Sequence, residues 1–446
     1  MKAQQDEFRR RVVVTGMGWV TPLGHTIDGV WQKLLAGESG VALTSIFDAT
    51  TFPTTFSAEV KGYDLSFDLM DAAPHLDACR RTHFLLGACA QAWRASGLDR
   101  FQELNLDRTG MYMATGEGST DFEAITTSCL SSWDAAAGAL DIPRWSEAAL
   151  SSLDAIRELE QEPNIALSRL AMLTGAAGPA LNSLTACAAS AQSIGEATQI
   201  LRRGDADVMI AGGANSMIHP FGVTGFNRLT TLSMRNDDPA SASRPFDATR
   251  DGFVIGEGAG VVILERLEHA VDRRASILAE VIGFGSTADA FRVTDQHPLS
   301  EGSIEAIRLA LADAGIEPEE VDYINAHGTG TRENDSHETF SIHAIFGEYA
   351  KKVPISSIKS MFGHLVTAAG VVEFIACVLA IRDQILPPTM NLRNPDPDCD
   401  LDYVPQVARK ANVDIAMSNN LGFGGQNDTL VVRRFEKGVR NRFEGG

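Results

Sequence analysis

One cysteine of the chain stands where a nucleophile would be favoured. Cys187 occurs in the segment SLTACAASAQSIGEATQILRRG, whose small residues predict a tightly packed helix that ends near Gly204. At the N-terminus of such a helix the dipole favours the thiolate, which is the nucleophilic form of cysteine. A free cysteine is more often a small core residue, so this position alone assigns no role. The remaining cysteines are interpreted as core residues: Cys79, Cys89, Cys129, Cys377 and Cys399.

Two histidines and a lysine occur in loops that resemble one another. His327 lies in YINAHGTGTREND, at the end of an apolar run and before a Gly/Thr turn. His364 lies in SIKSMFGHLVTAAG, just before a second helix of small residues, and Lys359 precedes it by five positions. One histidine at such a place is usually structural, and the lysine alone would be an ordinary solvated residue. Two histidines at equivalent positions are a candidate functional pair.

A glycine-rich segment near the C-terminus, NNLGFGGQND, could present backbone N–H groups to a ligand oxygen. Phe423 lies within it, next to Gly424. Other motifs are absent. VVVTGMGWVTPLG lacks the third glycine of a dinucleotide-binding loop, no phosphate-binding GxxxxGK[ST] motif occurs, and His337-Glu338 is not followed by the second histidine of HExxH. We therefore expect neither a cofactor nor a metal.

The segments that would position these residues alternate between β-branched runs and Ala-rich helical patterns. Several runs are apolar on both faces, as strands covered by helices on both sides are. The predicted strands are 12–15, 110–114, 208–211, 261–264, 277–281, 323–326 and 415–418. The pattern predicts an α/β protein.

Two pairs of segments indicate an internal duplication. The Ala-rich stretches 88–99 and 306–317 each end in a glycine and precede a strand with a Gly-rich turn. The small-residue helices 187–204 and 367–383 each follow a strand-like segment. Two matched pairs in the same order favour two similar halves, 11–267 and 276–434.

Composition and charge exclude several classes of protein. The 446 residues include 38 Lys plus Arg and 58 Asp plus Glu, a formal net charge of −20, which argues against binding nucleic acid. The N-terminus lacks the apolar region of a signal peptide. The longest apolar-rich stretch, 365–381, is interrupted by Glu373 and predicts a buried helix rather than a membrane span. Six cysteines without a CxxC pair fit a reducing cytoplasm.

The ordered set of motifs resembles the β-ketoacyl–acyl carrier protein synthases, the elongating condensing enzymes of the thiolase superfamily. The motifs are TACAAS, NAHGTGT, KSMFGH and GFGG, and the likeness extends to VVVTGMGWVTPLG, PNIALSRLAMLTGAAGP, GDADVMIAGGAN and RPFDATRDGFVIGEGAG. It covers about residues 11–432. The resemblance implies a thiolase-like fold, a duplicated five-layer αβαβα arrangement, and a homodimer. It also implies an acyl carrier protein as partner and a role in fatty-acid biosynthesis.

The resemblance also implies roles for the residues singled out above. Cys187 matches the acyl-accepting nucleophile, and His327 and His364 match the pair that promotes decarboxylation of a malonyl group. Lys359 matches the lysine that supports the pair, with Glu338 as its expected carboxylate partner.

Further positions match the substrate channel of the family. Phe423 matches the gating phenylalanine, and its backbone N–H with that of Cys187 should form an oxyanion hole. Thr329 and Thr331 match threonines beside the pantetheine arm, and Gly424 belongs to the glycine-rich loop. Carrier proteins of this family are acidic, so we expect the carrier protein to dock on a local patch of positive charge. The candidate residues are Arg80, Arg81, Arg228 and Arg235.

The sequence departs from the family pattern in one region, and it leaves other functions open. Segment 118–163 does not resemble the family, and Glu117 stands about where relatives have an apolar residue at the acyl pocket. A polyketide ketosynthase uses the same residues and is an alternative. A thiolase would need a second cysteine in a Gly-rich C-terminal turn, and a non-catalytic chain-length factor would lack Cys187.

Overall fold

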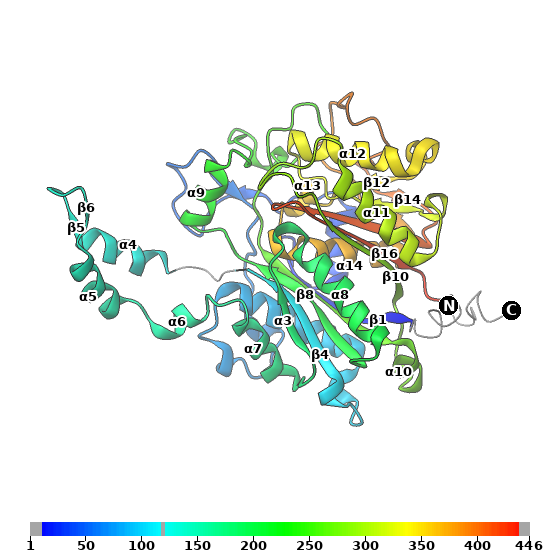
Figure 1. Cartoon of the computed structure of the whole chain (residues 1–446), viewed down its shortest axis with the longest axis horizontal. Helices are drawn as coiled ribbons and strands as arrows, with labels where there is room; N and C mark the ends of the chain where they lie inside the picture. Colours follow the sequence, from blue (N-terminus) through cyan, green and yellow to red (C-terminus); the bar gives the residue numbers. More distant parts are fainter. Residues whose placement is uncertain (1–10, 117–120, 437–446) are drawn as a thin grey trace.

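The computed structural model describes residues 11–116 and 121–436. In this part of the chain, ten strands pair into a mixed sheet (Figure 1). Their bounds, in spatial order, are β12 (Ile355–Ser356), β11 (Tyr323–Asn325), β15 (Ile415–Gly422), β16 (Gln426–Arg433), β10 (Ala279–Ala288), β1 (Val12–Val20), β9 (Gly258–Arg266), β8 (Val208–Asn215), β4 (Thr109–Thr115) and β7 (Ala180–Ser183).

The sheet consists of two sets of five strands with the same order. From the centre outwards, each set runs through its first, fifth, fourth, second and third strand along the chain. In each set the first two pairings are antiparallel and the last two are parallel. The sets meet where β1 pairs with β10. This order supports the predicted halves 11–267 and 276–434, which stay a prediction.

Helices cover both faces of the strands and form further layers (Figure 1). Helix α3 (Arg80–Ser96) packs on β1 and β9, and α11 (Glu301–Ala314) packs on β10 and β16. Between the two sets lie α8 (Ala189–Arg203) and α14 (Ala369–Asp383), which contact strands of both. Three apolar clusters form most of the core: one surrounds the two central helices and reaches both sets of strands, and one lies under the outer helices on each side. The layers are therefore helix, strand, helix, strand and helix.

The outer helices approach their strands closely because glycines in the strands leave room. A Cβ added to Gly18 of β1 would lie 2.1 Å from the carbonyl oxygen of Ala88 in α3. A Cβ added to Gly285 of β10 would lie 2.0 Å from the carbonyl oxygen of Ala306 in α11. The helix and strand backbones therefore lie close together because the helices are rich in alanine and the strands contain glycine.

The two central helices begin with the same strained turn. A 3₁₀ turn, Ala186–Ala188, leads into α8, and another, Val366–Ala368, leads into α14. Ala186 has φ +47° and Val366 has φ +46°, in the left-handed region that non-glycine residues rarely adopt. Cys187 and Thr367 therefore occupy equivalent places, each at the start of a buried helix.

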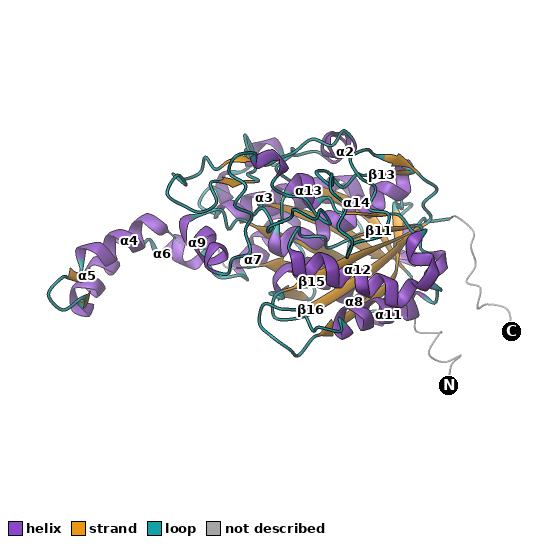
Figure 2. Cartoon of the chain, turned by 90° about the horizontal axis from the view of Figure 1, so that it is seen from above, coloured by secondary structure: helices purple, strands orange, loops and turns teal. Residues whose placement is uncertain are grey.

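An arm projects from the body between β4 and α7 (Ile165–Thr174) (Figures 1 and 2). Its elements are α4 (Phe122–Ser131), β5 (Trp133–Asp134), β6 (Ala139–Leu140), α5 (Ile142–Ser152) and α6 (Ala155–Leu159). Asp121, Asp141 and Asp154 cap the three helices. This arm corresponds to the segment 118–163 that departs from the family pattern.

The remaining helices and strands complete the body. Their bounds are α2 (Ile27–Leu35), β2 (Ala42–Leu43), β3 (Phe56–Ser57), α9 (Pro220–Arg228), α10 (Leu267–Asp272), α12 (Arg332–Phe346), α13 (Lys359–Phe362), β13 (Ile385–Leu386) and β14 (Arg409–Lys410).

The seven predicted strands are all present, although most are longer than predicted, and β16 was not predicted. The stretch 365–381 forms the buried helix α14, as expected, and none of the helices in the described ranges is long and apolar enough to cross a membrane.

Candidate active site

A cavity of about 430 Å³ opens where the ends of the two central helices meet the loops after β11 and β15. Cys187, His327 and His364 line it. One side-chain atom of each, the sulfur or a ring nitrogen, lies within 4.8 Å of the others. The sequence-predicted nucleophile and histidine pair thus come together, although more than 130 positions separate Cys187 from the histidines.

Burial dominates the electrostatics of Cys187. Burial raises the pKa of its thiol to about 11, while the charge of Lys359 and the backbone N–H groups of Phe423 and Cys187 act to lower it. The helix N-terminus therefore does not make the resting residue a thiolate, contrary to the expectation from sequence, because the loss of solvation is the larger effect. The N–H groups of Phe423 and Cys187 both face the sulfur, as two donors of an oxyanion hole would.

Both histidines are neutral and hold the same tautomer. Burial, followed by the charge of Lys359, keeps the pKa of His327 and of His364 well below the usual range. Nδ1 of His364 accepts the N–H of Val366 at 3.3 Å, and Nδ1 of His327 accepts from the Lys359 ammonium at 3.2 Å. Each ring proton is therefore on Nε2. Nε2 of His364 has no hydrogen-bond partner among the described residues.

Lys359 forms its ion pair with Glu373, not with Glu338 as predicted. Its Nζ donates to a carboxylate oxygen of Glu373 and, at 2.6 Å, to the carbonyl oxygen of His327. The side chain of Asn420 in β15 donates to the other carboxylate oxygen of Glu373. Glu373 was visible in the sequence as the one acid of the apolar stretch 365–381, but only the fold shows that α14 carries it to α13.

Glu338 instead holds the loop that carries His327. It is buried in α12 and accepts the backbone N–H groups of His327 and Gly328, each at 2.8 Å. One turn earlier, Asp335 accepts the N–H of Gly330 at 3.2 Å. Burial raises the pKa of Glu338 to about 7. Glu338 lies behind this loop and does not line the cavity.

The other predicted channel residues divide between the cavity wall and its surroundings. Thr329, Thr331 and Phe423 line the cavity. Gly424 does not, and its N–H donates to the carbonyl oxygen of Val293 at 2.7 Å, so its contact with substrate stays a prediction. Glu117 lies outside the described residues.

Among the arginines proposed for a carrier protein, Arg81 is in the wrong place. It is 1% exposed, and its Nη2 donates to the carbonyl oxygens of Glu160, Gln161 and Glu162 at the root of the arm. Arg80 is partly exposed and forms an ion pair with Glu257. The sequence could not reveal these buried contacts, because both partners are distant along the chain.

The triad of Cys187, His327 and His364 is a set of groups that could ligate a metal ion. The Lys359 ammonium, however, lies 3.2 Å from Nδ1 of His327. A buried positive charge at that distance opposes a second cation. The Nε2–H donors of the two neutral histidines suit a negative charge in the cavity, such as an oxyanion or an enolate.

Comparison with known proteins identifies the family. Residues 9–270 match the family model described as "Beta-ketoacyl synthase, N-terminal domain", and residues 278–393 match "Beta-ketoacyl synthase, C-terminal domain".

Curated relatives and solved structures agree with this match over nearly the whole chain. A protein of Coxiella burnetii named "3-oxoacyl-[acyl-carrier-protein] synthase 2" is 43% identical, with 96% of this chain and 99% of the relative covered. The Synechocystis protein of the same name is 41% identical over the same shares. A β-ketoacyl synthase from Burkholderia phymatum superposes with a TM-score of 0.85 at 31% identity, covering 96% of this chain and all of that one. The layers described above are those of the thiolase-like fold, and the chain belongs to the β-ketoacyl synthase family.

Proposed function

We propose that this protein condenses an acyl group, carried on Cys187, with malonyl–acyl carrier protein to give 3-oxoacyl–acyl carrier protein and carbon dioxide. The observation that carries the proposal is the meeting of a buried thiol with two neutral imidazoles in one cavity. The curated relatives, named 3-oxoacyl synthases, support elongation of the fatty-acid type.

The first half-reaction transfers the acyl group. The Cys187 sulfur attacks the thioester carbonyl of the acyl carrier, and the N–H groups of Cys187 and Phe423 stabilise the oxyanion. The carbon–sulfur bond to the carrier breaks, and the proton of the Cys187 thiol ends on the carrier thiol. Burial raises the pKa of this thiol to about 11, so the proton is on the sulfur when the acyl carrier binds.

The second half-reaction forms the new carbon–carbon bond. Malonyl carrier enters, and its thioester oxygen accepts hydrogen bonds from Nε2–H of His327 and of His364. Loss of carbon dioxide places an electron pair on this thioester as an enolate, which the two neutral donors stabilise. The enolate carbon attacks the acyl-Cys187 carbonyl, the carbon–sulfur bond to Cys187 breaks, and the sulfur leaves as a thiolate that takes up a proton from solvent to restore the thiol. Lys359 holds His327 in the tautomer that donates.

The alternatives are less well supported. One solved relative, at 32% identity and TM-score 0.85, is described as a "type II PKS acyl-carrier protein in complex with its ketosynthase". The identity to the curated 3-oxoacyl synthases is higher, and that description supports a carrier protein as partner in either pathway. Cys187 argues against a non-catalytic chain-length factor. The cysteines of the described ranges are all free, and we place the enzyme in the cytoplasm as part of this proposal.

Carbon dioxide release from malonyl carrier tests the assignment. His327→Ala and His364→Ala should each lower release at least about a hundredfold, since each removes a donor to the enolate oxygen. Acyl loading of Cys187 should persist in both variants. Release at the wild-type rate in both single variants would remove the pair from the mechanism.

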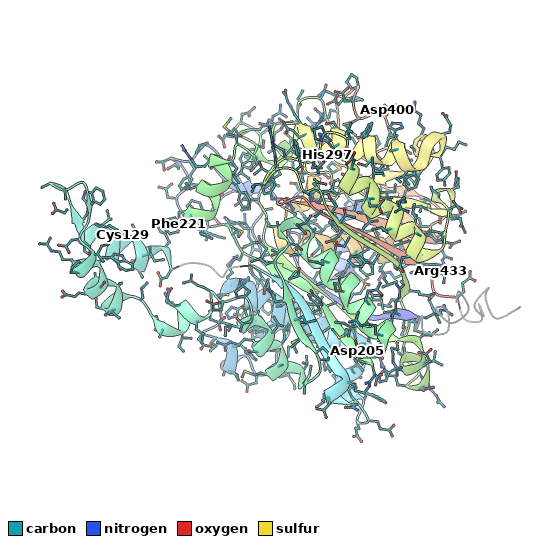
Figure 3. All side chains as sticks on the ribbon, in the orientation of Figure 1. Cys129, Asp205, Phe221, His297, Asp400 and Arg433 are labelled. Atoms are coloured by element: carbon teal, nitrogen blue, oxygen red, sulfur yellow. The ribbon has the colours of Figure 1, made fainter. Side chains whose placement is uncertain are left out.

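We also propose that the protein is a homodimer in which the arm packs against the second copy. The arm exposes apolar side chains that have no cover in the isolated chain, among them Leu130 at 73% and Leu150 at 87%. Within the chain, Phe122 of the arm contacts Phe221 of α9, with ring centroids 4.9 Å apart, and Figure 3 labels Phe221 and, in the arm, Cys129. The edge strand β7 lies nearby in the chain, with Leu181 exposed.

Native mass measures this association. The wild type should have twice the mass of the chain, and the double variant Leu130→Glu/Leu150→Glu should shift towards the monomer. Val271→Glu, at an exposed apolar residue of α10 away from the arm, is the matched control and should remain dimeric. A monomeric wild type would contradict the dimer, and a dimeric double variant would contradict the role of the arm.

A further inference from the structure

The turn before Cys187 is tied to the helix that follows it by one side chain. Gln192 lies in the first part of α8, five positions after Cys187. Its amide oxygen accepts the hydroxyl of Ser183 at 2.5 Å and the hydroxyl of Thr185 at 2.7 Å. The two hydroxyl oxygens lie 3.2 Å apart. The three side chains thus form a hydrogen-bonded triangle that joins the end of β7 to α8, across the residues that lead to the nucleophile.

The backbone that this triangle spans is strained. Ala186 has φ +47°, a conformation that costs free energy in a residue with a Cβ and persists only where surrounding contacts enforce it. Leu184 contributes little to holding the segment, because it is 56% exposed. The two residues whose side chains do hold it, Ser183 and Thr185, both bind Gln192.

On its other side, the turn lies against the hairpin turn that carries Phe423. A Cβ added to Gly422 would lie 3.0 Å from the carbonyl oxygen of Thr185 and 3.3 Å from the backbone nitrogen of Cys187. The backbone N–H groups of Cys187 and Phe423 are the two donors that face the Cys187 sulfur. A shift of the turn before Cys187 would therefore move one donor of the oxyanion hole relative to the other.

We propose that Gln192 is a positioning residue for acyl transfer, which fixes the N–H and the sulfur of Cys187 through Ser183 and Thr185. This role rests on the proposed function, because it concerns the acylation step of the same site. Loss of the triangle should misplace the donors to the oxyanion and slow acylation. Decarboxylation should continue, because the two histidines are carried by other loops.

The rates of acylation and of carbon dioxide release separate this role from a general loss of structure. Gln192→Met removes both hydrogen bonds and keeps a flexible side chain of similar length. It should slow acylation of Cys187 by a saturating small acyl thioester at least about tenfold, while carbon dioxide release from malonyl carrier stays within about twofold of the wild type. Gln199→Met is the matched control and should acylate at the wild-type rate. Gln199 is also a partly buried glutamine of α8, but its side chain has no hydrogen bond with a described residue.

A double-mutant cycle tests whether the effect passes through the triangle. In the Ser183→Ala/Thr185→Val background, Gln192→Met should slow acylation no further, because its partners are already absent. Should Gln192→Met not fold, Thr185→Val alone removes one of the two bonds and should give the same selective loss of acylation.

Three outcomes would overturn the proposal: acylation of Gln192→Met at the wild-type rate, an equal fall of acylation and carbon dioxide release, or effects that simply add in the triple variant. Failure of the wild-type protein to become acylated at Cys187 would instead contradict the proposed function, and this role with it.

Discussion

At Cys187 the buried surroundings and the neighbouring charges act on the thiol in opposite directions. Burial, the larger effect, raises its pKa to about 11, and Lys359 with the N–H of Phe423 only partly offsets it. The resting enzyme therefore carries a thiol, and the reactivity of Cys187 comes from the substrate complex, in which the oxyanion hole holds the developing charge.

Alkylation rates measure this protonation state. The rate of iodoacetamide modification at the Cys187 peptide should rise about tenfold per pH unit and keep rising above about pH 9, because only the thiolate reacts. Mass mapping separates Cys187 from the partly exposed Cys79 and Cys129. A plateau near neutral pH would instead indicate a thiolate at rest.

The stability of variants at Glu373 and Glu338 tests which of these carboxylates supports Lys359. Glu373→Gln leaves the buried ammonium without its anion and should cost about 3–5 kcal/mol of stability. Glu338→Gln keeps one acceptor for the loop N–H groups and should cost less, about 1–3 kcal/mol. Denaturant midpoints of the two variants compare them directly. A larger loss of stability for Glu338→Gln than for Glu373→Gln would indicate that Glu338 is the main support of the site.

Residue types and order were enough to single out Cys187, the two histidines and Lys359, which the structure brings together, while their catalytic roles stay proposals. They could not predict which carboxylate meets Lys359. Glu338 is on the helix that follows His327, while Glu373 is on α14, and the choice depends on how α13 and α14 pack. For the same reason, Arg81 resembled a surface residue in the sequence although it is buried against the arm root.

At the scale of elements, the strand and helix patterns predicted most of the body. The predicted Ala-rich helices exist and end at left-handed glycines, Gly97 and Gly315. Strand β16 was not predicted because it begins directly after the glycine-rich turn. Strands β15 and β16 pair as a hairpin, and this turn connects them. Phe423 therefore lies in the turn of a hairpin whose two strands belong to the large sheet.

The close contact of β1 with α3 predicts a large effect of a single methyl group. Gly18→Ala places a Cβ against the backbone of α3, which cannot move aside, so it should destabilise the protein by about 1–3 kcal/mol. Gly225→Ala, in α9 with nothing within 4 Å of its Cβ, should be neutral or stabilising. Thermal unfolding of both variants is the measurement. Equal melting temperatures would mean that the layers are not packed as closely as described.

At the scale of the whole molecule, a protein with a net charge of −20 should repel an acidic carrier protein, so docking requires a local positive charge. Arg228 is exposed at the end of α9, next to Leu229 of the cavity wall, and forms no ion pair with any described residue. A local positive charge at the mouth can steer a carrier although the molecule as a whole repels it.

Charge reversal tests this steering. Arg228→Glu should raise the apparent KM for a carrier-bound substrate several-fold at low salt and leave a small thioester substrate unaffected. Arg203→Glu, at an exposed arginine that ends α8 and does not line the cavity, is the matched control. Equal effects on both substrates would count against docking at this point.

The central claim is that the acyl group is carried on Cys187 while the two halves of the fold supply the rest of the site. Its most direct test is the mass of the protein after incubation with an acyl carrier protein, followed by peptide mapping. The account predicts one acyl group per chain, on the peptide that contains Cys187, and none in Cys187→Ala. An adduct on another peptide, or full loading of Cys187→Ala, would contradict it.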